Sequence, residues 1–420
     1  MAFDLDSRSF WQEPQVEAEL KRVFDICNGC RRCYNLCPSF NDLFARLDKE
    51  SVDGEAEKLD PGDLRSVTDL CYQCKLCFNH CPYTPPHRWD VDFPRLMLRS
   101  KAVQVRRDGV PFQDRFLGHV DWMGRMGSLF APVANWAISN RFNRWIMEKL
   151  LGIHRDRILP TYASETFRSW FDQRKGGTKS GKKVALFYTC SVNFNDPETG
   201  KACVKVLEKN SIEVACPEQR CCGMPYLDGG DIEATRKSAR ANTDSLYALV
   251  KEGCDVVVPG PTCSYMLKQE YPLLLNDEAS RAVAARTFDI CEYLMALHGD
   301  GKLDTRFIRG AGQIAYQIPC HLRAQNIGYK SRDLMELIPN TTVRLIEKCS
   351  AIDGTWGLKR QYYDLSLKVA EPLLKEIRES RAEVTVSDCP LAALQIEQGL
   401  GRKTLHPIRM LERAYGLDGK

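Results

Sequence analysis

Short apolar runs alternate with longer amphipathic stretches from residue 183 onwards. Continuous apolar runs bounded by turn residues predict buried strands, and apolar residues spaced three and four positions apart predict helices. The predicted strands are 183–189, 212–215, 255–258, 313–318, 342–346 and 383–386, and the predicted helices between and after them are 200–210, 231–251, 264–275, 288–299 and 359–380. Strands that alternate with helices in this way predict parallel sheets.

The order of these elements occurs twice, and cysteines follow the strands in both series. Because ligands of parallel sheets lie beyond the carboxyl ends of the strands, we expect the cysteines of each series to converge. The first series carries Cys190, Cys221, Cys222 and Cys263, and the second carries Cys320, Cys349 and Cys389. Convergence favours shared ligation of a metal cluster over a set of buried structural cysteines.

The N-terminal part of the chain has a different pattern. Val16, Leu20 and Val23 form one face of a helix predicted over 12–25. A polar insert over 40–60 predicts a loop with a short helix, and Pro61 begins another short helix.

Two runs of cysteines punctuate this N-terminal part, and both read C-x2-C-x2-C-x3-C-P. The first run is Cys27, Cys30, Cys33 and Cys37, and the second is Cys71, Cys74, Cys77 and Cys81. This spacing is that of bacterial two-cluster ferredoxins, in which the fourth cysteine of each run binds the other cluster. We therefore predict two [4Fe–4S] clusters, one held by Cys27, Cys30, Cys33 and Cys81, the other by Cys71, Cys74, Cys77 and Cys37. A zinc site or a disulfide framework is the alternative, but zinc sites usually show paired cysteines or histidines.

Residues 94–157 combine an excess of Lys and Arg with an amphipathic pattern of Trp, Phe and Met. Basic residues beside aromatic ones suit a membrane surface or an acidic partner. The alternative is a set of helices whose apolar face packs on the rest of the protein, with the arginines in solvent. Lys, Gly and Ser residues over 173–183 predict a flexible linker.

Composition adds the cellular context. The chain has 420 residues, 44% hydrophobic and 27% charged, with a net charge of +4, so it reads as a soluble globular protein and nothing requires a nucleic-acid partner. The sequence opens without the apolar segment of a secretory signal, and no stretch reaches the roughly 18 apolar residues of a spanning helix. In a reducing, cytoplasmic compartment, 19 cysteines indicate metal ligands and not disulfides. No Walker loop and no Gly-x-Gly-x-x-Gly after a strand is present, which argues against a nucleotide site in this chain.

Several motifs resemble known families. Cys190, Cys221-Cys222-Gly223-Met224-Pro225 and Pro261-Thr262-Cys263 resemble the cysteine-rich CCG domain of the heterodisulfide reductase B-subunit and its relatives. The two ferredoxin-type runs, the basic middle region, Leu159-Pro160-Thr161-Tyr162 and Gln395-Ile396-Glu397 resemble the family of the C-subunit of anaerobic glycerol-3-phosphate dehydrogenase.

The resemblance implies two CCG repeats after the ferredoxin-type domain, each with five cysteines in its full form. This chain departs from that pattern at Gly260, Ser350 and Ala392, which stand where cysteines are expected. Four thiolates remain in the first repeat and suffice for a third cluster. Three remain in the second, so its occupancy stays open, with His321, Ser350 or a partner as possible further ligands.

The sequence therefore predicts an α/β protein with an N-terminal α-helical ferredoxin-type domain and duplicated parallel-sheet CCG repeats. The expected bounds are 1–92 for the ferredoxin-type domain, 93–180 for the basic helical region and linker, 181–300 for the first CCG domain and 301–420 for the second. The resemblance implies an iron–sulfur oxidoreductase component that passes electrons from a flavoprotein dehydrogenase to a quinone or another carrier. We expect a cytoplasmic protein, and the basic, aromatic segment 94–157 favours a peripheral contact with the inner membrane face.

Two other functions are weighed against this one. A thiol/disulfide or peroxide-linked reductase acting at the CCG cluster, with a rubrerythrin-like partner, is the alternative, and the missing motif cysteines speak against it. A protein that uses its clusters only structurally is a third interpretation, which two tandem cluster motifs disfavour.

Overall fold

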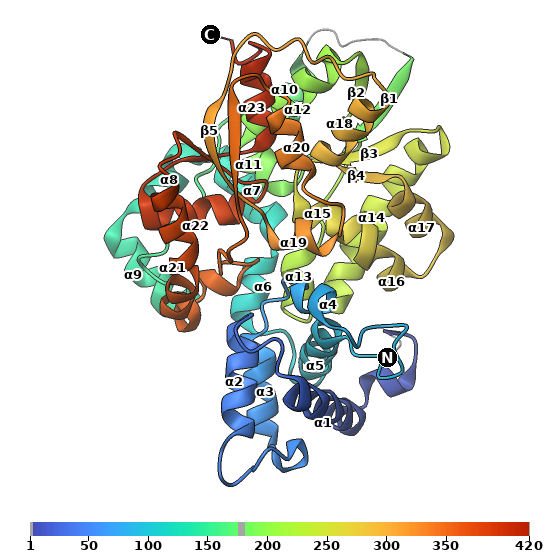
Figure 1. Ribbon diagram of the computed structural model, residues 1–420, viewed down its shortest axis with the longest axis vertical. Coiled ribbons are helices and arrows are strands. Elements are labelled where there is room, and N and C mark those ends of the chain that lie inside the picture. Colours follow the sequence, from blue (N-terminus) through green and yellow to red (C-terminus); the bar gives the residue numbers. More distant parts are fainter. Residues whose placement is uncertain (1–2, 175–180, 420) are drawn as a thin grey trace. The chain divides into compact units, whose positions relative to one another are not determined.

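The computed structural model describes residues 3–174 and 181–419, so residues 175–180 of the predicted linker lie outside the described residues. The chain forms two compact units (Figure 1). Unit 1 comprises 1–118 and 225–235, and unit 2 comprises 119–224 and 236–420.

Unit 1 is helical. Its elements are the 3-10 helices η1 (Arg8–Trp11) and η2 (Ala56–Lys58) and the α-helices α1 (Glu13–Cys30), α2 (Pro38–Leu47), α3 (Pro61–Leu70), α4 (Leu76–His80), α5 (Phe93–Asp108) and α6 (Phe112–Gly118). Helices α1, α2, α3 and α5 pack side by side around one apolar core (Figure 1). Within this core, the rings of Phe40 and Phe93 stack with their centroids 4.3 Å apart.

Helix α2 lies where the sequence predicted a loop with a short helix. Pro38 starts it at the first helical turn, and Phe40, Leu43, Phe44 and Leu47 are all buried. Their spacing of three and four residues places them on one face, which packs into the core of unit 1. The short helix predicted for this insert thus lies at its beginning, and the loop follows it up to η2.

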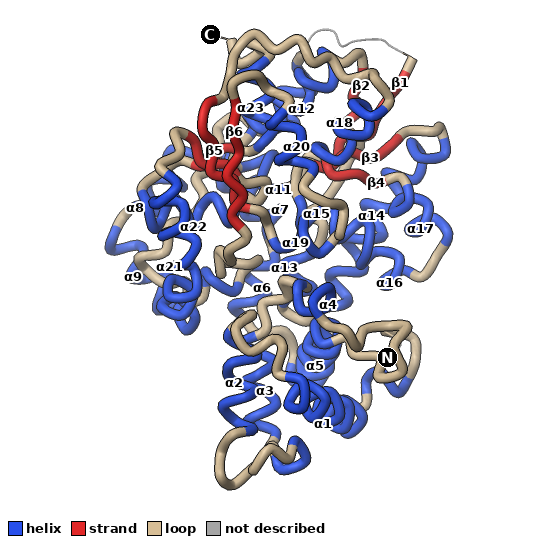
Figure 2. Tube along the Cα trace, viewed as in Figure 1, coloured by secondary structure: helices blue, strands red, loops and turns tan. Residues whose placement is uncertain are grey.

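Unit 2 holds two parallel sheets, drawn in red in Figure 2. Their strand orders are β2-β1-β3-β4 and β6-β5-β7-β8. The strands are β1 (Lys182–Leu186), β2 (Ile212–Ala215), β3 (Asp255–Val258), β4 (Thr287–Asp289), β5 (Gly312–Gln317), β6 (Thr341–Ile346), β7 (Val384–Val386) and β8 (Thr404–Leu405). The two identical orders confirm the predicted duplication and the α/β fold class.

Helices connect these strands and precede them. Before the first sheet come α7 (Val120–Leu129), α8 (Ala131–Ser139), α9 (Arg141–Leu151) and α10 (Phe167–Gln173). The first repeat adds α11 (Cys190–Phe194), α12 (Pro197–Lys209), α13 (Met224–Asp228), α14 (Ile232–Lys251), α15 (Pro261–Tyr265), the π-helix η3 (Met266–Glu270), α16 (Tyr271–Leu275), α17 (Glu278–Ala285) and α18 (Ile290–Gly299). The second repeat adds α19 (Cys320–Ala324), α20 (Lys330–Glu336), η4 (Trp356–Leu358), η5 (Arg360–Tyr362), α21 (Tyr363–Ser380), α22 (Pro390–Leu400) and α23 (Pro407–Ala414).

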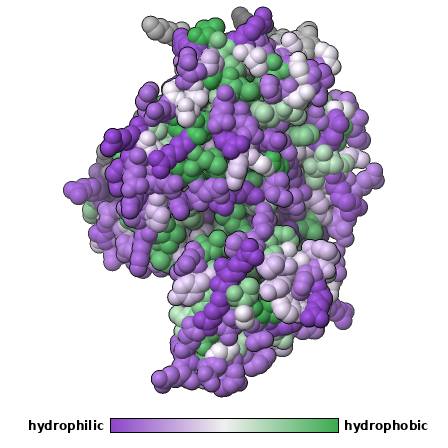
Figure 3. Space-filling view, viewed as in Figure 1, coloured by the Kyte–Doolittle hydropathy of each residue, from purple (hydrophilic) through white to green (hydrophobic). Residues whose placement is uncertain are grey.

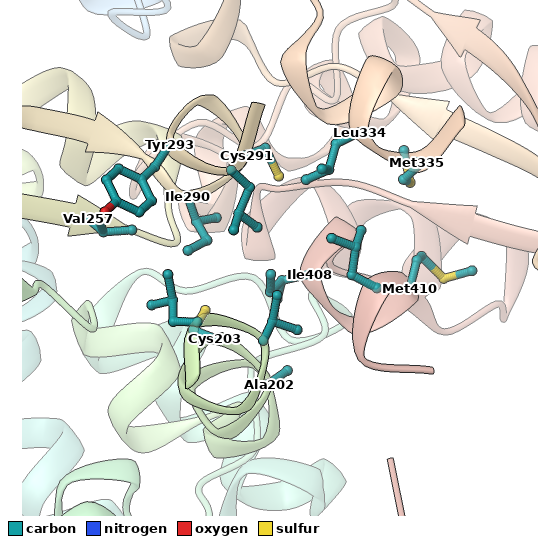
Figure 4. Packing of buried hydrophobic residues seen from close by; sticks show 14 of the residues in the cluster. Ala202, Cys203, Val257, Ile290, Cys291, Tyr293, Leu334, Met335, Ile408 and Met410 are labelled. Carbon is teal, nitrogen blue, oxygen red and sulfur yellow. The ribbon is translucent and has the colours of Figure 1, made fainter. Parts of the chain in front are cut away.

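One core joins the two repeats. Side chains of α12 and α18 from the first repeat meet those of α20 and α23 from the second (Figure 4). The labelled residues include Cys203, Cys291, Leu334 and Ile408, and all four are buried. The repeats therefore fold as one packed body, and Cys203 and Cys291 serve as small core residues.

Candidate iron–sulfur sites

The first cysteine run lies where α1 ends and α2 begins. Cys27 and Cys30 are in the last turn of α1, which stops at Arg31 in the left-handed conformation with a φ of 48°. The N–H of Arg31 donates to the carbonyl of Cys27 at 2.8 Å. Cys37 is the N-cap residue of α2, directly before Pro38. The helix end and the proline thus turn the fourth cysteine away from the first three.

The second run follows α3 and wraps around α4. Cys71 caps the C-terminus of α3, Cys77 lies inside α4, and Cys81 caps the C-terminus of α4. Gln73 and Lys75 flank Cys74 with φ values of 57° and 65°. Non-glycine residues seldom adopt this left-handed conformation, and here it curls the loop that carries the thiols.

Thiols of the two runs lie near one another. Burial, followed by the neighbouring thiols of Cys33, Cys81 and Cys30, raises the pKa of Cys27 well above its ordinary value. Burial, followed by the thiols of Cys74, Cys71, Cys37 and Cys33, raises the pKa of Cys77 well above its ordinary value. Cys81 of the second run therefore lies near Cys27, and Cys37 and Cys33 of the first run lie near Cys77.

Polar side chains that the sequence analysis missed surround Cys71. The Gln73 amide donates to the Cys71 sulfur at 3.4 Å, and the buried Lys75 ammonium donates to the Gln73 carbonyl oxygen at 2.7 Å. Lys101 of α5 donates to the backbone carbonyl of Cys71 at 2.7 Å. Two buried or half-buried ammonium groups beside a set of thiolates favour a negatively charged group there, and hydrogen bonds to sulfur tune cluster potentials.

The first repeat brings its four predicted cysteines together at the carboxyl edge of its sheet. Cys190 begins α11 after β1, Cys221 and Cys222 follow β2, and Cys263 lies in α15 after β3. A hydrogen bond to Cys221, then burial, raises the pKa of Cys190 well above its ordinary value. Hydrogen bonds to Cys221 and Cys263, followed by burial, raise the pKa of Cys222. The four sulfurs therefore form one contiguous cluster.

Buried hydrogen bonds fix the turn that carries Cys221 and Cys222. The Tyr271 hydroxyl donates to the carbonyl of Cys222 at 3.0 Å and accepts from the Asn242 amide at 2.9 Å. Gly223 follows with a φ of 91°, a conformation that glycine adopts without strain.

Asp121 of α7 is a further member of this site that the sequence analysis missed. Its carboxylate accepts the N–H of Cys221 at 2.9 and 3.1 Å. Burial, and then the nearby Cys221, raises the pKa of Asp121 to about 6. No spacing motif connects residues so far apart in sequence, so only the fold could place this carboxylate.

Helix α7 reaches the site because two of its glycines admit aromatic rings. A Cβ on Gly124 would overlap the ring of Phe194 in α11, and one on Gly127 would overlap the ring of Tyr162. Overlap with a ring cannot be relieved without movement of α7. Gly124 therefore allows close packing of α7 on α11 of the first repeat, and Gly127 allows close packing on Tyr162.

A cavity of about 410 Å³ opens beside these thiols. It is lined by Asp121, Arg125, Ser128, Leu129, Ser164, Thr166, Arg168, Ser169, Tyr188, Cys190, Asn193, Phe194, Gln219, Arg220 and Cys221. The Ser128 hydroxyl is buried and has no hydrogen-bond partner among the described residues. The cavity thus combines two site cysteines, arginines and an available hydroxyl with the exposed side chain of Leu129 at its edge.

Leu129 also belongs to an apolar surface patch formed by α7, α8 and α9. The patch consists of Trp122, Met126, Leu129, Phe130, Val133, Trp136, Phe142, Trp145 and Leu150, all exposed, with Trp122 at 62% and Leu129 at 70%. Exposed hydrophobic residues also appear among hydrophilic ones on the face drawn in Figure 3. Of the two interpretations of the basic region, the structure disfavours packing of the apolar face within the chain. Exposed apolar side chains gathered on neighbouring helices are typical of surfaces that contact a membrane or another protein.

Arg144 is not available to a membrane surface, although it lies in the basic region. It is only 4% exposed and donates to the carbonyls of His154, Arg155 and Arg157 at 2.6, 3.1 and 2.7 Å. This arginine fastens α9 to the loop that follows it. Arg141 and Lys149 of the same helix are exposed.

None of the helices within residues 3–174 and 181–419 is long and apolar enough to cross a membrane.

The second repeat places its three cysteines at the equivalent strand ends. Cys320 begins α19 after β5, Cys349 follows β6, and Cys389 is the N-cap residue of α22 after β7. Strand β5 pairs with both β6 and β7, so the three positions are neighbours along one sheet edge. The sulfur of Cys320 lies 3.1 Å from a carboxylate oxygen of Asp353.

The donor sets fit iron–sulfur clusters. Thiolates are the usual ligands of such clusters, and four are needed to hold a cubane. Each of the two groups in unit 1 offers four sulfurs, as does the first repeat. In the second repeat, three sulfurs and the Asp353 carboxylate offer four donors.

Comparison with known proteins agrees with this chemistry. Residues 20–107 match a family described as the citrate utilization protein B Fer4-like domain, and residues 184–268 and 314–397 both match the Cysteine-rich domain. The fold and the sites thus define an iron–sulfur electron-transfer protein with a ferredoxin-like domain and two cysteine-rich repeats.

The chain belongs to the family of the anaerobic glycerol-3-phosphate dehydrogenase C-subunit, as its sequence motifs indicated. It is 31% identical to the C-subunit from Escherichia coli (strain K12) over 303 residues, which cover 71% of this chain and 76% of the relative. Family membership confirms the resemblance seen in the sequence, iron–sulfur binding and a role among redox subunits.

Two further relatives carry other names. The B-subunit of fumarate reductase (CoM/CoB) from Methanothermobacter marburgensis is 27% identical over 277 residues, 62% of this chain and 53% of the relative. Lactate utilization protein A of Geobacillus thermodenitrificans is 28% identical over 255 residues, 56% of this chain and 98% of the relative. Proteins similar to this chain are therefore named for different substrates, and the name of a relative alone does not fix a substrate for this chain.

Proposed function

We propose that this chain accepts electrons from a flavoprotein dehydrogenase partner and delivers them to a quinone at a membrane surface. The observation that carries the proposal is the cavity beside Cys190 and Cys221, whose edge residue Leu129 is part of the apolar surface patch. A lipophilic carrier resting in a membrane would meet the patch first and the cavity next.

We assign the ligands as follows. Cys27, Cys30, Cys33 and Cys81 hold one [4Fe–4S] cluster, Cys71, Cys74, Cys77 and Cys37 hold a second, and Cys190, Cys221, Cys222 and Cys263 hold a third. Bound clusters of this type accept and donate single electrons. The grouping of the thiols by their mutual effect on pKa supports the crossed sets.

The protein's own part at the cavity is to bind and orient the quinone. Reduction of a quinone to a quinol takes two electrons and two protons, and its two carbonyl oxygens need hydrogen-bond donors. Ser128 has an unused hydroxyl, and Arg125 and Arg220 supply cationic donors along the same wall. The apolar tail of the quinone would pass Leu129 and lie along the patch, because apolar surface favours an apolar environment.

The donor is proposed to be a flavoprotein because the sequence carries no nucleotide-binding fingerprint of its own. The relative in Escherichia coli is named as a subunit of a dehydrogenase, which supports a partner that oxidises the substrate. Oxidation of a substrate by hydride transfer requires a flavin or nicotinamide cofactor.

Reoxidation kinetics test the proposed function. Cluster-loaded protein, reduced with one equivalent of dithionite per cluster, is mixed anaerobically with anionic vesicles with and without a menaquinone analogue. Quinone vesicles should reoxidise the protein, and Ser128→Phe, which fills the cavity, should slow this step by about tenfold, equivalent to about 1.4 kcal/mol.

Ser139→Phe on the exposed side of α8 is the matched control and should leave the rate unchanged. If quinone vesicles fail to reoxidise protein that ferricyanide oxidises at once, the acceptor is not a quinone. A disulfide substrate that oxidises the protein instead would favour the thiol/disulfide alternative.

A further inference from the structure

The second repeat keeps the architecture of a metal site although it has lost cysteines. Its three remaining cysteines occupy the strand ends equivalent to those that carry thiols in the first repeat. Cys320, Cys349 and Cys389 follow β5, β6 and β7, as the thiols of the first repeat follow β1, β2 and β3.

The turn after Cys349 retains an unfavourable backbone conformation. Ala351 has a φ of 54°, at the position where the first repeat has Gly223 with a φ of 91°. The N–H of Ala351 donates to the Cys349 sulfur at 3.2 Å. A left-handed alanine is strained and persists only where its surroundings require it. The turn thus holds a sulfur in place in a repeat where a degenerate site would have been free to relax.

Asp353 supplies the donor that the three cysteines lack. One oxygen of its carboxylate, Oδ1, accepts from the Cys320 thiol at 3.1 Å. The other oxygen, Oδ2, is buried and has no hydrogen-bond partner among the described residues. The carboxylate therefore contacts the Cys320 thiol and keeps its second oxygen available.

A buried carboxylate oxygen without a partner is costly unless a cation or a donor compensates for it. Asp353 is only 9% exposed, so water does not readily fill that role. An iron bound by the neighbouring Cys320 sulfur would satisfy this oxygen directly.

His321 is the competing ligand, and its surroundings argue against it. Its Nδ1 atom is hydrogen-bonded to the Thr262 hydroxyl at 2.9 Å, and its ring stacks on Tyr265 with centroids 5.3 Å apart. Atoms of His321, Cys320 and Asp353 lie within 4.8 Å of one another, so the ring borders the site. Its contacts with Thr262 and Tyr265 hold α19 against α15 of the first repeat, which makes it a positioning residue.

We infer that Asp353 is the fourth ligand of an iron–sulfur cluster that Cys320, Cys349 and Cys389 hold in the second repeat. On assembly, each thiol would bind iron as a thiolate and release its proton to solvent, and the Asp353 carboxylate would bind iron in place of the hydrogen bond that Cys320 donates to it. The inference does not depend on the membrane or quinone part of the proposed function.

Metal analysis of the full chain tests this inference. Wild type, Asp353→Ala and Asp353→Cys are loaded anaerobically with iron and sulfide and compared for iron, sulfide and zinc per chain and by EPR. Asp353→Ala should lose between one and four irons per chain and either lose one cluster signal or gain that of a three-iron cluster. Asp353→Cys should keep the iron but change the EPR spectrum or the midpoint potential of one cluster.

Asp333→Asn, which removes a carboxylate that pairs with Arg332 in the same repeat, is the control and should keep iron and spectrum. Any one of three results would overturn the inference. The first is unchanged iron content and EPR in Asp353→Ala, the second is an unchanged EPR spectrum and midpoint potential in Asp353→Cys, and the third is zinc in place of iron at this site. The Cys variant decides the matter even if the Ala variant folds poorly.

Discussion

At the scale of single residues, the crossed pairing of the N-terminal cysteines makes a distinctive prediction. Cys81 lies beside Cys27, Cys30 and Cys33, although it ends the other run. Cys81→Ser should therefore damage the cluster of the first three cysteines and spare the cluster of Cys71, Cys74 and Cys77. EPR of the reduced protein resolves the two clusters.

Cys37→Ser is the reciprocal variant and should produce the opposite loss. If each variant removed the signal of the cluster bound by its own run, the crossed ligation would be wrong.

His406 in the second repeat should make the free energy of unfolding depend on pH. Burial lowers its pKa to about 4, with Asp388 acting weakly in the opposite direction, and its Nδ1 accepts the N–H of Ile408 at the start of α23. As pH falls, the unfolded state, with a histidine pKa of about 6.5, binds the proton first, so the free energy of unfolding should decrease between about pH 6.5 and pH 4. Above pH 6.5 this contribution is fully present.

Denaturant unfolding of the cluster-loaded protein measures this effect. Between about pH 7.5 and 5.5, wild type should lose about 1 kcal/mol more than His406→Asn, which keeps an acceptor for the Ile408 N–H but cannot be protonated in this range. Equal losses would mean that His406 does not titrate on unfolding.

Residues that act through sequence spacing were predictable, whereas residues that act through the fold were not. The spacing of the cysteines within each run was enough to identify them as candidate cluster ligands. By contrast, Asp121, Gln73 and Asp353 join their sites only through contacts in the folded chain. These contacts form when α7, the loop of the second cysteine run and the turn after Cys349 take up their positions. Arg144 shows the converse, since a basic residue on an amphipathic helix can bind backbone carbonyls instead of facing solvent.

At the scale of elements, the packing of α7 on α11 connects the basic region to the first repeat. Gly124→Ala places a methyl group into the space of the Phe194 ring, so α7 must shift. Overpacking of this kind costs about 1–3 kcal/mol, and the shift should also displace Asp121 from Cys221. Thermal unfolding and iron content per chain measure both consequences.

Gly299→Ala is the matched control, because a Cβ there meets nothing within 4 Å. It should be neutral or slightly stabilising, since alanine favours helix over glycine. Equal stability and iron content in both variants would show that the α7 contact is not needed by the site.

Helices and strands whose hydrophobic pattern extends over several residues were predicted well. Helix α14 and strands β2 and β3 lie where their periodicity placed them. Strands β4 and β8 were missed because they are only three and two residues long and run directly into a helix or a loop. Such edge strands are defined by pairing with β3 and β7, a contact that no local pattern encodes.

At the scale of the whole molecule, the apolar surface patch predicts a reversible attachment to anionic membranes. Trp122→Ser with Trp136→Ser should lower cosedimentation with anionic vesicles, and Arg141→Gln with Lys149→Gln should lower it mainly at low salt. Each basic residue near the surface contributes about 1 kcal/mol, and salt screens that contribution. Iron content should stay at the wild-type level.

Ile308→Ser removes a side chain that is 71% exposed elsewhere in unit 2 and is the control for the tryptophans. Lys375→Gln serves the same purpose for the basic residues. If wild-type protein stays in the supernatant at both salt concentrations, the patch instead contacts a partner protein.

Freeze-quench EPR tests the central claim, that electrons leave through the first repeat, most directly. Fully reduced wild type and Cys263→Ser are mixed with quinone-containing vesicles and frozen at increasing times. We expect the signals of the two N-terminal clusters to disappear in wild type and to persist in Cys263→Ser, because the variant lacks a ligand at the exit site. Disappearance at the same rate in both proteins would contradict the claim, since electrons would then reach the quinone without passing the first repeat.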